Sequence, residues 1–174
     1  MANAIALSPK TADKWLDQMK PQLAQALPGM VKPEQFVRVA LTTMRKNPDL
    51  TQCTPVSVAA SLMTSAQLGL VCDGVLGHAY LIPFNNRKAG TKECQLVIGY
   101  KGLLALAHRS GEVADITSEC VYRGDTFEFG LGDDPFIKHS PGPNYGISDG
   151  DIEWVYVVVR FRNGGKAIDR KSVV

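Results

Sequence analysis

The clearest alternation of apolar and polar positions in the chain flanks a short basic segment. Residues Gly77–Phe84 and Cys94–Tyr100 each alternate with a period of two, which is typical of half-buried β-strands. The segment between them, Asn85–Glu93, is polar and carries one acid and three cations: Arg87, Lys88 and Lys92. The pattern therefore predicts a β-hairpin with a long basic tip.

A short amphipathic helix is predicted directly after the hairpin, ending at Ser110 and Gly111. At about 100° per residue, its apolar face comprises Tyr100, Leu103, Leu104 and Ala107. Its polar face comprises Lys101, Ala105, His108 and Arg109. We expect the apolar face to be buried. Two interpretations of the polar face remain open: a solvated surface, or a flat surface between two cations that a bulky anion approaches.

Apolar residues at helical spacing predict three further helices nearer the N-terminus, after a disordered segment over Met1–Pro9. The first covers Thr11–Met19, with a second turn from Pro21 through Leu27. The second covers Pro33–Lys46, because proline suits a first turn and Asn-Pro ends a helix. The third is capped by Thr54 and runs to Gly69. It is apolar on nearly every side, so we expect it to pack centrally against a sheet.

The second half of the chain reads as strands and loops. Val113–Phe129 is predicted to form one long strand or a bent pair, with a turn or bulge at Arg123–Asp125. Leu131–Asp151 is rich in Gly, Pro and Asp and is predicted to be a loop. The β-branched segment Glu153–Phe161 is predicted to form a strand, and an Asn-Gly-Gly turn returns the chain through Lys166–Asp169.

This order of elements predicts an α+β domain built on an antiparallel sheet packed with helices. The 174 residues suffice for one domain, which we expect to comprise an N-terminal helical lobe over residues 1–70 and a sheet core over residues 71–174. The net charge of +2 conceals an asymmetry, because Met1–Ser110 has a net charge of +6 and Gly111–Val174 has −4. An oligomer could set the acidic half of one subunit against the basic half of the next.

Two sequence motifs of catalysis, the ATP-binding loop and the zinc-protease motif, are missing. The chain contains no GxxxxGK[ST] or HExxH pattern, and its three histidines are not grouped. Its four cysteines, Cys53, Cys72, Cys94 and Cys120, lack zinc-site spacing and lie among apolar neighbours, which predicts buried reduced thiols. No apolar run resembles a signal peptide or a membrane span, so we expect an intracellular protein. Function is therefore expected to rest on binding.

The segment LGHAYLIPF followed by QLVIGYKGLLALAHRSG resembles the RecT family of phage single-strand annealing proteins (recombinases). The resemblance continues upstream in AQALPGMVKPEQFVRVALTTMRKNPDL and SLMTSAQLGL, and downstream in VYRGDTFEFGLG and KHSPGP. These segments come in family order and cover roughly Leu23 to Lys166. The resemblance implies a β-β-β-α core in which the sheet and a helix line a DNA groove.

The resemblance also implies a function. A family member anneals single-stranded DNA without ATP, binding single strands and the nascent duplex along a homo-oligomer that is a ring or a helical filament. It is not an enzyme, needs no cofactor, and uses Mg²⁺ only as a DNA counterion. A phage exonuclease and a host single-strand-binding protein are the implied partners, in the cytoplasm of a bacterial host and away from membranes.

The family continues past the position of Val174 into a helical segment and an acidic tail, which this chain is expected to lack. A second interpretation therefore stays open. The protein would be an oligomerising structural or interaction protein, a degenerate or truncated recombinase, that binds no DNA productively.

The expected DNA contacts form three groups of cations. We rank Lys101 and Arg109 first, then the hairpin-tip residues Arg87, Lys88 and Lys92, and then Arg160 and Arg162. The last two alternate with Phe161 and so are predicted to share a strand face, where edge protection by charge is an equally good interpretation. Near the bases the candidate aromatics are Tyr100 and Tyr80, although we expect both in the core, and His78 and Gln95 could bond a sugar or phosphate oxygen.

Overall fold

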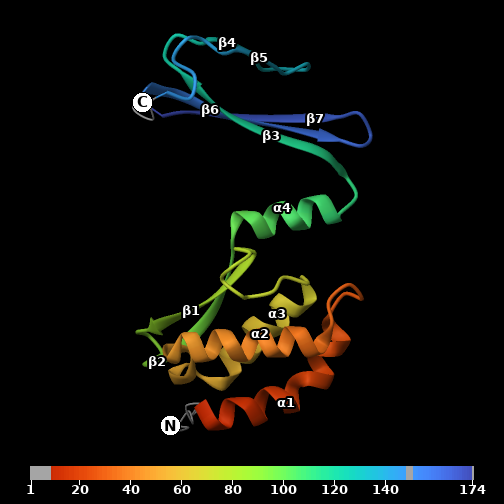
Figure 1. Ribbon diagram of the computed structural model, residues 1–174, viewed down its shortest axis with the longest axis vertical. Coiled ribbons are helices and arrows are strands. Elements are labelled where there is room, and N and C mark those ends of the chain that lie inside the picture. Colours follow the sequence, from red (N-terminus) through yellow and green to blue (C-terminus); the bar gives the residue numbers. More distant parts are fainter. Residues whose placement is uncertain (1–8, 148–150, 174) are drawn as a thin grey trace. The chain divides into compact units, whose positions relative to one another are not determined.

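The computed structural model describes residues 9–147 and 151–173 of the chain (Figure 1). The chain forms two compact units, which divide between Leu106 and Ala107. Of the disorder expected over Met1–Pro9, residues 1–8 lie outside the described residues, as do residues 148–150 of the long expected loop, whereas Pro9 begins the first helix. The described elements are helices and antiparallel strands, so the predicted α+β class is confirmed.

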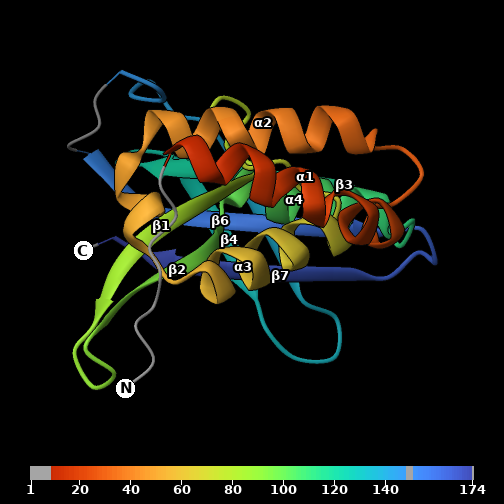
Figure 2. The same cartoon turned by 90° about the horizontal axis from the view of Figure 1, so that it is seen from below.

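The first unit packs helices around one apolar core. In chain order it comprises α1 (Pro9–Ala26), α2 (Pro33–Lys46), the 3-10 helix η1 (Pro48–Gln52), α3 (Pro55–Gln67), β1 (Ala79–Asn86) and β2 (Thr91–Ile98). Helices α1 and α2 lie side by side (Figures 1 and 2), and α3 packs against β2. The hydroxyl of Ser61 on α3 donates to the carbonyl oxygen of Cys94 on β2 at 3.1 Å. The predicted packing of α3 against a strand is confirmed, but the expected burial on nearly every side is wrong, because Val56, Ala60 and Thr64 are exposed.

The predicted helices are present, with one difference. The bounds of α2 are those predicted, and Thr54 caps α3 by accepting the N–H of Ser57 at 3.4 Å. By contrast, α1 runs without interruption through Pro21, where a break was expected. Leu16 and Leu23, on either side of that proline, are both fully buried. Tertiary packing of the two leucines thus outweighs the hydrogen bond that a proline removes from a helix interior.

The predicted hairpin is confirmed, but its tip is shorter than expected. Strands β1 and β2 pair antiparallel up to Asn86 and Thr91, so only Arg87–Gly90 form the turn. Gly90 has φ +65°, a conformation that favours glycine. Lys92, which was expected in the tip, therefore lies within β2.

Helix α4 (Tyr100–Arg109) has the predicted bounds but buries a different face. Its buried residue is Gly102, where a Cβ atom would lie 2.1 Å from the carbonyl oxygen of His78, and Leu106 packs against the core of the first unit. Tyr100 and Leu103 are 70% and 56% exposed, so the expected burial of the apolar face is wrong. A close backbone approach that only glycine permits has oriented the helix, in preference to its leucines.

The second unit consists of strands alone after the end of α4. They are β3 (Val113–Tyr122), β4 (Thr126–Gly130), β5 (Phe136–Ser140), β6 (Ile152–Phe161) and β7 (Lys166–Ser172). Strands β3, β6 and β7 form an antiparallel sheet in that order, and β4 pairs with β5 as a hairpin. This three-stranded sheet matches the strands of the implied β-β-β-α core.

Two predictions for this region have different outcomes. The bent pair over Val113–Phe129 is confirmed as β3 and β4, and the turn between them is closed by the N–H of Asp125, which donates to the Tyr122 carbonyl oxygen at 3.0 Å. The loop expected over Leu131–Asp151 is wrong in part, because it contains β5. A strand of only five residues between proline-rich turns has too little periodicity to stand out, and its pairing with β4 stabilises it.

Candidate nucleic-acid interface

The outward side of the β1–β2 hairpin is apolar and exposed. Tyr80, Ile82 and Phe84 on β1 and Val97 on β2 are between 38% and 45% exposed. We call this side, together with Gln95, the hairpin face. An exposed apolar stripe of this kind marks an interaction surface more often than isolated surface residues do.

The inward side of the same hairpin packs against the helices, with Leu96 and Ile98 also in contact with the core. Ala79, Leu81 and Cys94 are buried against the helices. The sequence analysis identified the alternation but did not assign a role to Ile82 or Phe84. Both sides of the alternation carry large apolar residues, so the sequence offered no local signal for which side is buried.

Two glycines, Gly77 and Gly99, position the residues at the base of the hairpin face. A Cβ atom at Gly99 would lie 2.2 Å from the carbonyl oxygen of Gly77, so only glycine fits at this crossing. A Cβ atom at Gly77 would lie 3.1 Å from the Tyr80 hydroxyl and 3.5 Å from Cδ of Lys101. Tyr80 and Lys101 therefore meet at one place, although they come from a strand and a helix.

The predicted aromatic residues are both exposed there. Tyr80 is 40% exposed and Tyr100 is 70% exposed, so their expected place in the core is wrong. The Lys101 ammonium lies 6.0 Å from the centroid of the Tyr100 ring. A ring beside a cation is the combination with which proteins hold a base and its phosphate.

The two polar candidates differ in accessibility. Gln95 is exposed on the hairpin face, paired in register with Ile82. His78 is half-buried, and its carbonyl oxygen accepts the N–H of Gly99 at 3.0 Å. Gln95 is thus more accessible to a ligand than His78.

The cations of the first unit divide into unpaired and paired side chains. Arg87 and Lys88 in the hairpin turn, and Lys101 on α4, are exposed and have no ion pair among the described residues. Lys92 instead lies 3.0 Å from a carboxylate oxygen of Asp49 and donates to Gln52 at 3.0 Å. Its charge is balanced within the chain, and it ties β2 to η1.

The predicted cations in the second unit are dispersed. Arg160 on β6 lies 3.1 Å from Asp115 on β3. Arg162 is exposed in the turn after β6, so strand alternation with Arg160 does not decide its direction. Its backbone N–H donates to the Glu112 carbonyl oxygen at 2.9 Å. Arg109 is half-buried at the end of α4.

A buried polar cluster in the second unit resembles a catalytic relay. His139 Nε2 lies 2.9 Å from Asp125 Oδ2, and His139 Nδ1 lies 3.2 Å from the Tyr156 hydroxyl. Burial opposes ionisation of Asp125, but N–H groups of Tyr122 and Gly142 and the His139 ring together lower its pKa.

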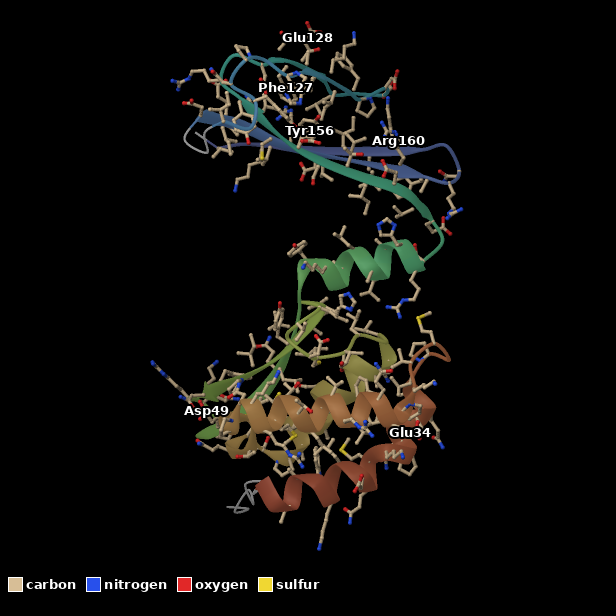
Figure 3. All side chains as sticks on the ribbon, viewed as in Figure 1. Glu34, Asp49, Phe127, Glu128, Tyr156 and Arg160 are labelled. Atoms are coloured by element: carbon tan, nitrogen blue, oxygen red, sulfur yellow. The ribbon has the colours of Figure 1, made fainter. Side chains whose placement is uncertain are left out.

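The cluster is arranged for structure and not for nucleophilic attack. Burial raises the pKa of Tyr156, so its phenol stays protonated, which is the reverse of an activated nucleophile. Phe127 stacks on the Tyr156 ring with centroids 5.7 Å apart, between the β4–β5 hairpin and the sheet (Figure 3). The cluster therefore fastens this hairpin to β6. Among the described residues, no group of three or more His, Cys, Asp or Glu side chains is placed to hold a metal ion.

The part of the chain that the structure describes contains no helix long and apolar enough to cross a membrane.

Comparison with known proteins shows which family this chain resembles. The model of the RecT family matches residues 34–173. Protein RecT of Escherichia coli (strain K12) is 43% identical over 160 residues, which cover 89% of this chain and 58% of that protein. The uncharacterized protein YqaK of Bacillus subtilis (strain 168) is 31% identical over 91 residues, covering 52% of this chain and 30% of that protein. The chain thus spans less than two thirds of the length of either relative.

Proposed function

Because this chain belongs to the RecT family, we propose that it anneals complementary single strands of DNA without ATP, in homologous recombination. The observation that carries the proposal is the hairpin face. Its exposed rings lie between unpaired cations at both ends: Arg87 and Lys88 at the turn, and Lys101 at the base. Bases and phosphates need these two kinds of surface side by side.

The rings of the hairpin face support bases, and its cations contact phosphates. Every base presents a π-face, so stacking on Tyr80 and Phe84, and on Tyr100 of the adjoining helix α4, does not select a sequence and contributes about 1–3 kcal/mol per base. Phosphate contacts by Arg87, Lys88 and Lys101 likewise carry no sequence information. A protein that must pair any two complementary strands needs to bind DNA without sequence selectivity.

Annealing on such a surface needs no free energy from ATP hydrolysis. Base pairing supplies the free energy, and the protein lowers the barrier by neutralising phosphates and holding bases apart from their own strand. Each neutralised phosphate releases counterions, so binding to a single strand weakens with salt by a log–log slope of about 0.7 per contact. Mg²⁺ then acts only as a competing counterion, and no other cofactor takes part.

One hairpin face holds few bases, so many copies act along a strand, in a ring or a helical filament. The distribution of charge supports this part of the proposal. The first unit, Met1–Leu106, has a net charge of +5, and the second, Ala107–Val174, has −3. Opposite charges favour contact between the first unit of one copy and the second unit of the next. A phage exonuclease and a host single-strand-binding protein, in the bacterial cytoplasm, are the proposed partners.

The test is strand annealing without ATP. One labelled oligonucleotide is mixed with the full chain, its complement is added, and duplex formation and particle size are followed at low and moderate salt. We expect accelerated annealing that is lost in Arg87→Ala with Lys88→Ala, and reduced in Phe84→Ala. The matched controls are Lys14→Ala with Lys32→Ala, two exposed lysines elsewhere in the first unit, and Val56→Ala, an exposed apolar residue of α3.

Two results would contradict the proposal at different levels. Annealing that survives in the hairpin variants as well as in the controls would remove the hairpin face from the interface. A wild-type chain that neither binds nor anneals oligonucleotides would remove the function itself.

A second candidate function rests on the paired cations. Lys92, Arg160 and Lys166 each have a carboxylate partner within the chain. This self-neutralisation favours a structural protein that assembles with itself and binds no DNA productively. Assemblies whose size is the same with and without oligonucleotide would support this candidate over annealing.

A further inference from the structure

Two cations face each other across neighbouring strands of the second unit. Arg160 on β6 is paired in register with Lys166 on β7. Like charges in this position repel and destabilise a sheet. Each cation has its own acidic partner, because Arg160 lies 3.1 Å from Asp115 and Lys166 lies 3.1 Å from Asp134. We call these four residues the charge row; Figure 3 labels Arg160, near the turn between β6 and β7.

Asp115 is held in place by two features of β3. The hydroxyl of Thr117 donates to the same carboxylate oxygen that Arg160 contacts, at 2.9 Å. The register also shifts between Val113 and Asp115, so Val113 is buried opposite Phe161 while Asp115 pairs with Arg160. Such bulges redirect a single side chain at low cost to the sheet. The carboxylate is therefore aimed at Arg160 by the strand itself.

Asp134 is held much more loosely. It lies in the connection between β4 and β5, and its side chain is 92% exposed. The Lys166 and Arg160 side chains are also open to solvent, at 41% and 61% exposed. Exposed ion pairs are readily exchanged for other partners, because solvent screens them. A ligand with stronger anionic oxygens can thus reach both cations.

We propose that Asp115 and Asp134 occupy, in the DNA-free protein, the places that phosphates of a bound strand take beside Arg160 and Lys166, and so restrain DNA binding at the charge row. The inference rests on the proposed function and adds a regulation to it. A carboxylate and a phosphodiester each offer two anionic acceptor oxygens to a guanidinium or an ammonium group, so one substitutes for the other. The strand must displace the acids before it gains these contacts.

The restraint has a use in annealing. A row of free cations would bind any polyanion tightly, and a strand held too tightly cannot shift to find its complement. Internal carboxylates reduce the binding free energy that each phosphate contact contributes, although the cations remain in place. They also lower the number of DNA counterions released, because a cation that is shared with a carboxylate neutralises less of the phosphate charge.

The test removes the acids one at a time without changing the size of the side chain. Asp115→Asn and Asp134→Asn are compared with Asp133→Asn, which removes the same charge at an exposed residue without an ion pair among those described, in the same loop as Asp134. The readout is the affinity for a fixed single-stranded oligonucleotide as a function of salt. We expect the first two variants to bind about two- to fivefold more tightly than Asp133→Asn, with a steeper dependence on salt.

A second pair of variants ties the gain to its cation. Adding Arg160→Gln to Asp115→Asn should return the affinity to about the wild-type value, and so should Lys166→Gln added to Asp134→Asn. Thermal unfolding of every variant controls for loss of the sheet. Because Asp134 is exposed, Asp134→Asn should fold normally even if Asp115→Asn destabilises the sheet.

The outcomes separate this inference from the proposed function. If the wild type binds and anneals but Asp115→Asn and Asp134→Asn match Asp133→Asn, the restraint is overturned and the function stands. A gain that persists after the cation is removed would also overturn it, since net charge alone would explain the result. If neither the wild type nor any variant binds the oligonucleotide, both the proposed function and the proposed restraint are wrong.

Discussion

The two units stabilise themselves in different ways. In the first, aliphatic side chains from every helix converge, and Leu16, Leu23, Leu50 and Leu62 have no exposed surface. In the second, Val113 and Val121 are the buried apolar residues among those described. There the contacts are made by rings, with Phe127 stacked on Tyr156 and Phe129 beside Trp154 at 5.5 Å, and by the polar cluster around His139.

The difference shows which physical term each unit depends on. The first has a closed aliphatic core, which the hydrophobic effect stabilises by itself. The second has a sheet covered by one short hairpin, and much of its valine-rich strand β6 stays half-exposed. Its geometry therefore depends on directional contacts, namely ring stacking and hydrogen bonds, which specify one arrangement more than they add stability.

The largest effect is expected from a cavity in the first unit. Leu62→Ala on α3 should destabilise the protein by about 2–5 kcal/mol, because the side chain is fully buried and its neighbours cannot all close the space. Val56→Ala on the same helix, 78% exposed, is the control and should cost less than about 0.5 kcal/mol. Urea unfolding measures both. Equal costs would show that the core of this unit is not close-packed.

A smaller effect is expected from a ring in the second unit. Phe127→Leu keeps an apolar side chain but removes the stack on Tyr156, and should cost about 0.5–1.5 kcal/mol. Near-ultraviolet circular dichroism should change with it, since the neighbouring rings lose their fixed orientation. Phe36→Leu is the comparison. Phe36 lies on α2 in the core of the first unit, so this change should leave the aromatic signal of the second unit unchanged. An unchanged signal in Phe127→Leu would contradict the dependence of this unit on ring contacts.

The sequence predicted the first unit better than the second for the same reason. Proline and Asn-Pro punctuation and a strong apolar stripe placed both ends of α2 correctly. The five residues of β5 carry no comparable pattern, and the strand exists because β4 pairs with it. Periodicity reports burial of apolar groups, so it is weak where rings and hydrogen bonds make the contacts.

At the candidate site, alternation showed that one side of the hairpin faces outward, but not which one. The answer depended on Gly77, Gly99 and Gly102, whose close contacts join segments that no local pattern connects. The same contacts expose Tyr100, which helical periodicity placed in the core. The carboxylate partners of Lys92 and Arg160 are equally non-local, so the sequence could name these cations but not their pairing.

Acid should weaken the polar cluster of the second unit. The pKa of Asp125 is lowered in the folded chain, so its contribution to stability is complete above the unfolded value of about 4 and is lost as the pH falls through the folded value. Asp125→Asn should be less stable than the wild type at pH 7, and this difference should shrink towards pH 3. Urea midpoints across that range measure it. Asp133→Asn, an exposed acid without an ion pair among the described residues, is the control. A difference that does not change with pH would mean that the ionised carboxylate is not what fastens the hairpin.

The smallest expected effects compare cations of the two units on DNA. Lys88 is unpaired in the hairpin turn, whereas Lys166 lies 3.1 Å from Asp134. Lys88→Met should lower the slope of log affinity against log salt by about 0.7, the value of one phosphate contact on a single strand. Lys166→Met should lower the slope by less than half as much, because Asp134 already neutralises that charge in the free protein. Equal decreases would show that an exposed carboxylate does not reduce a cation's contribution to DNA binding. The difference between unpaired cations in the first unit and paired cations in the second would then have no consequence for binding.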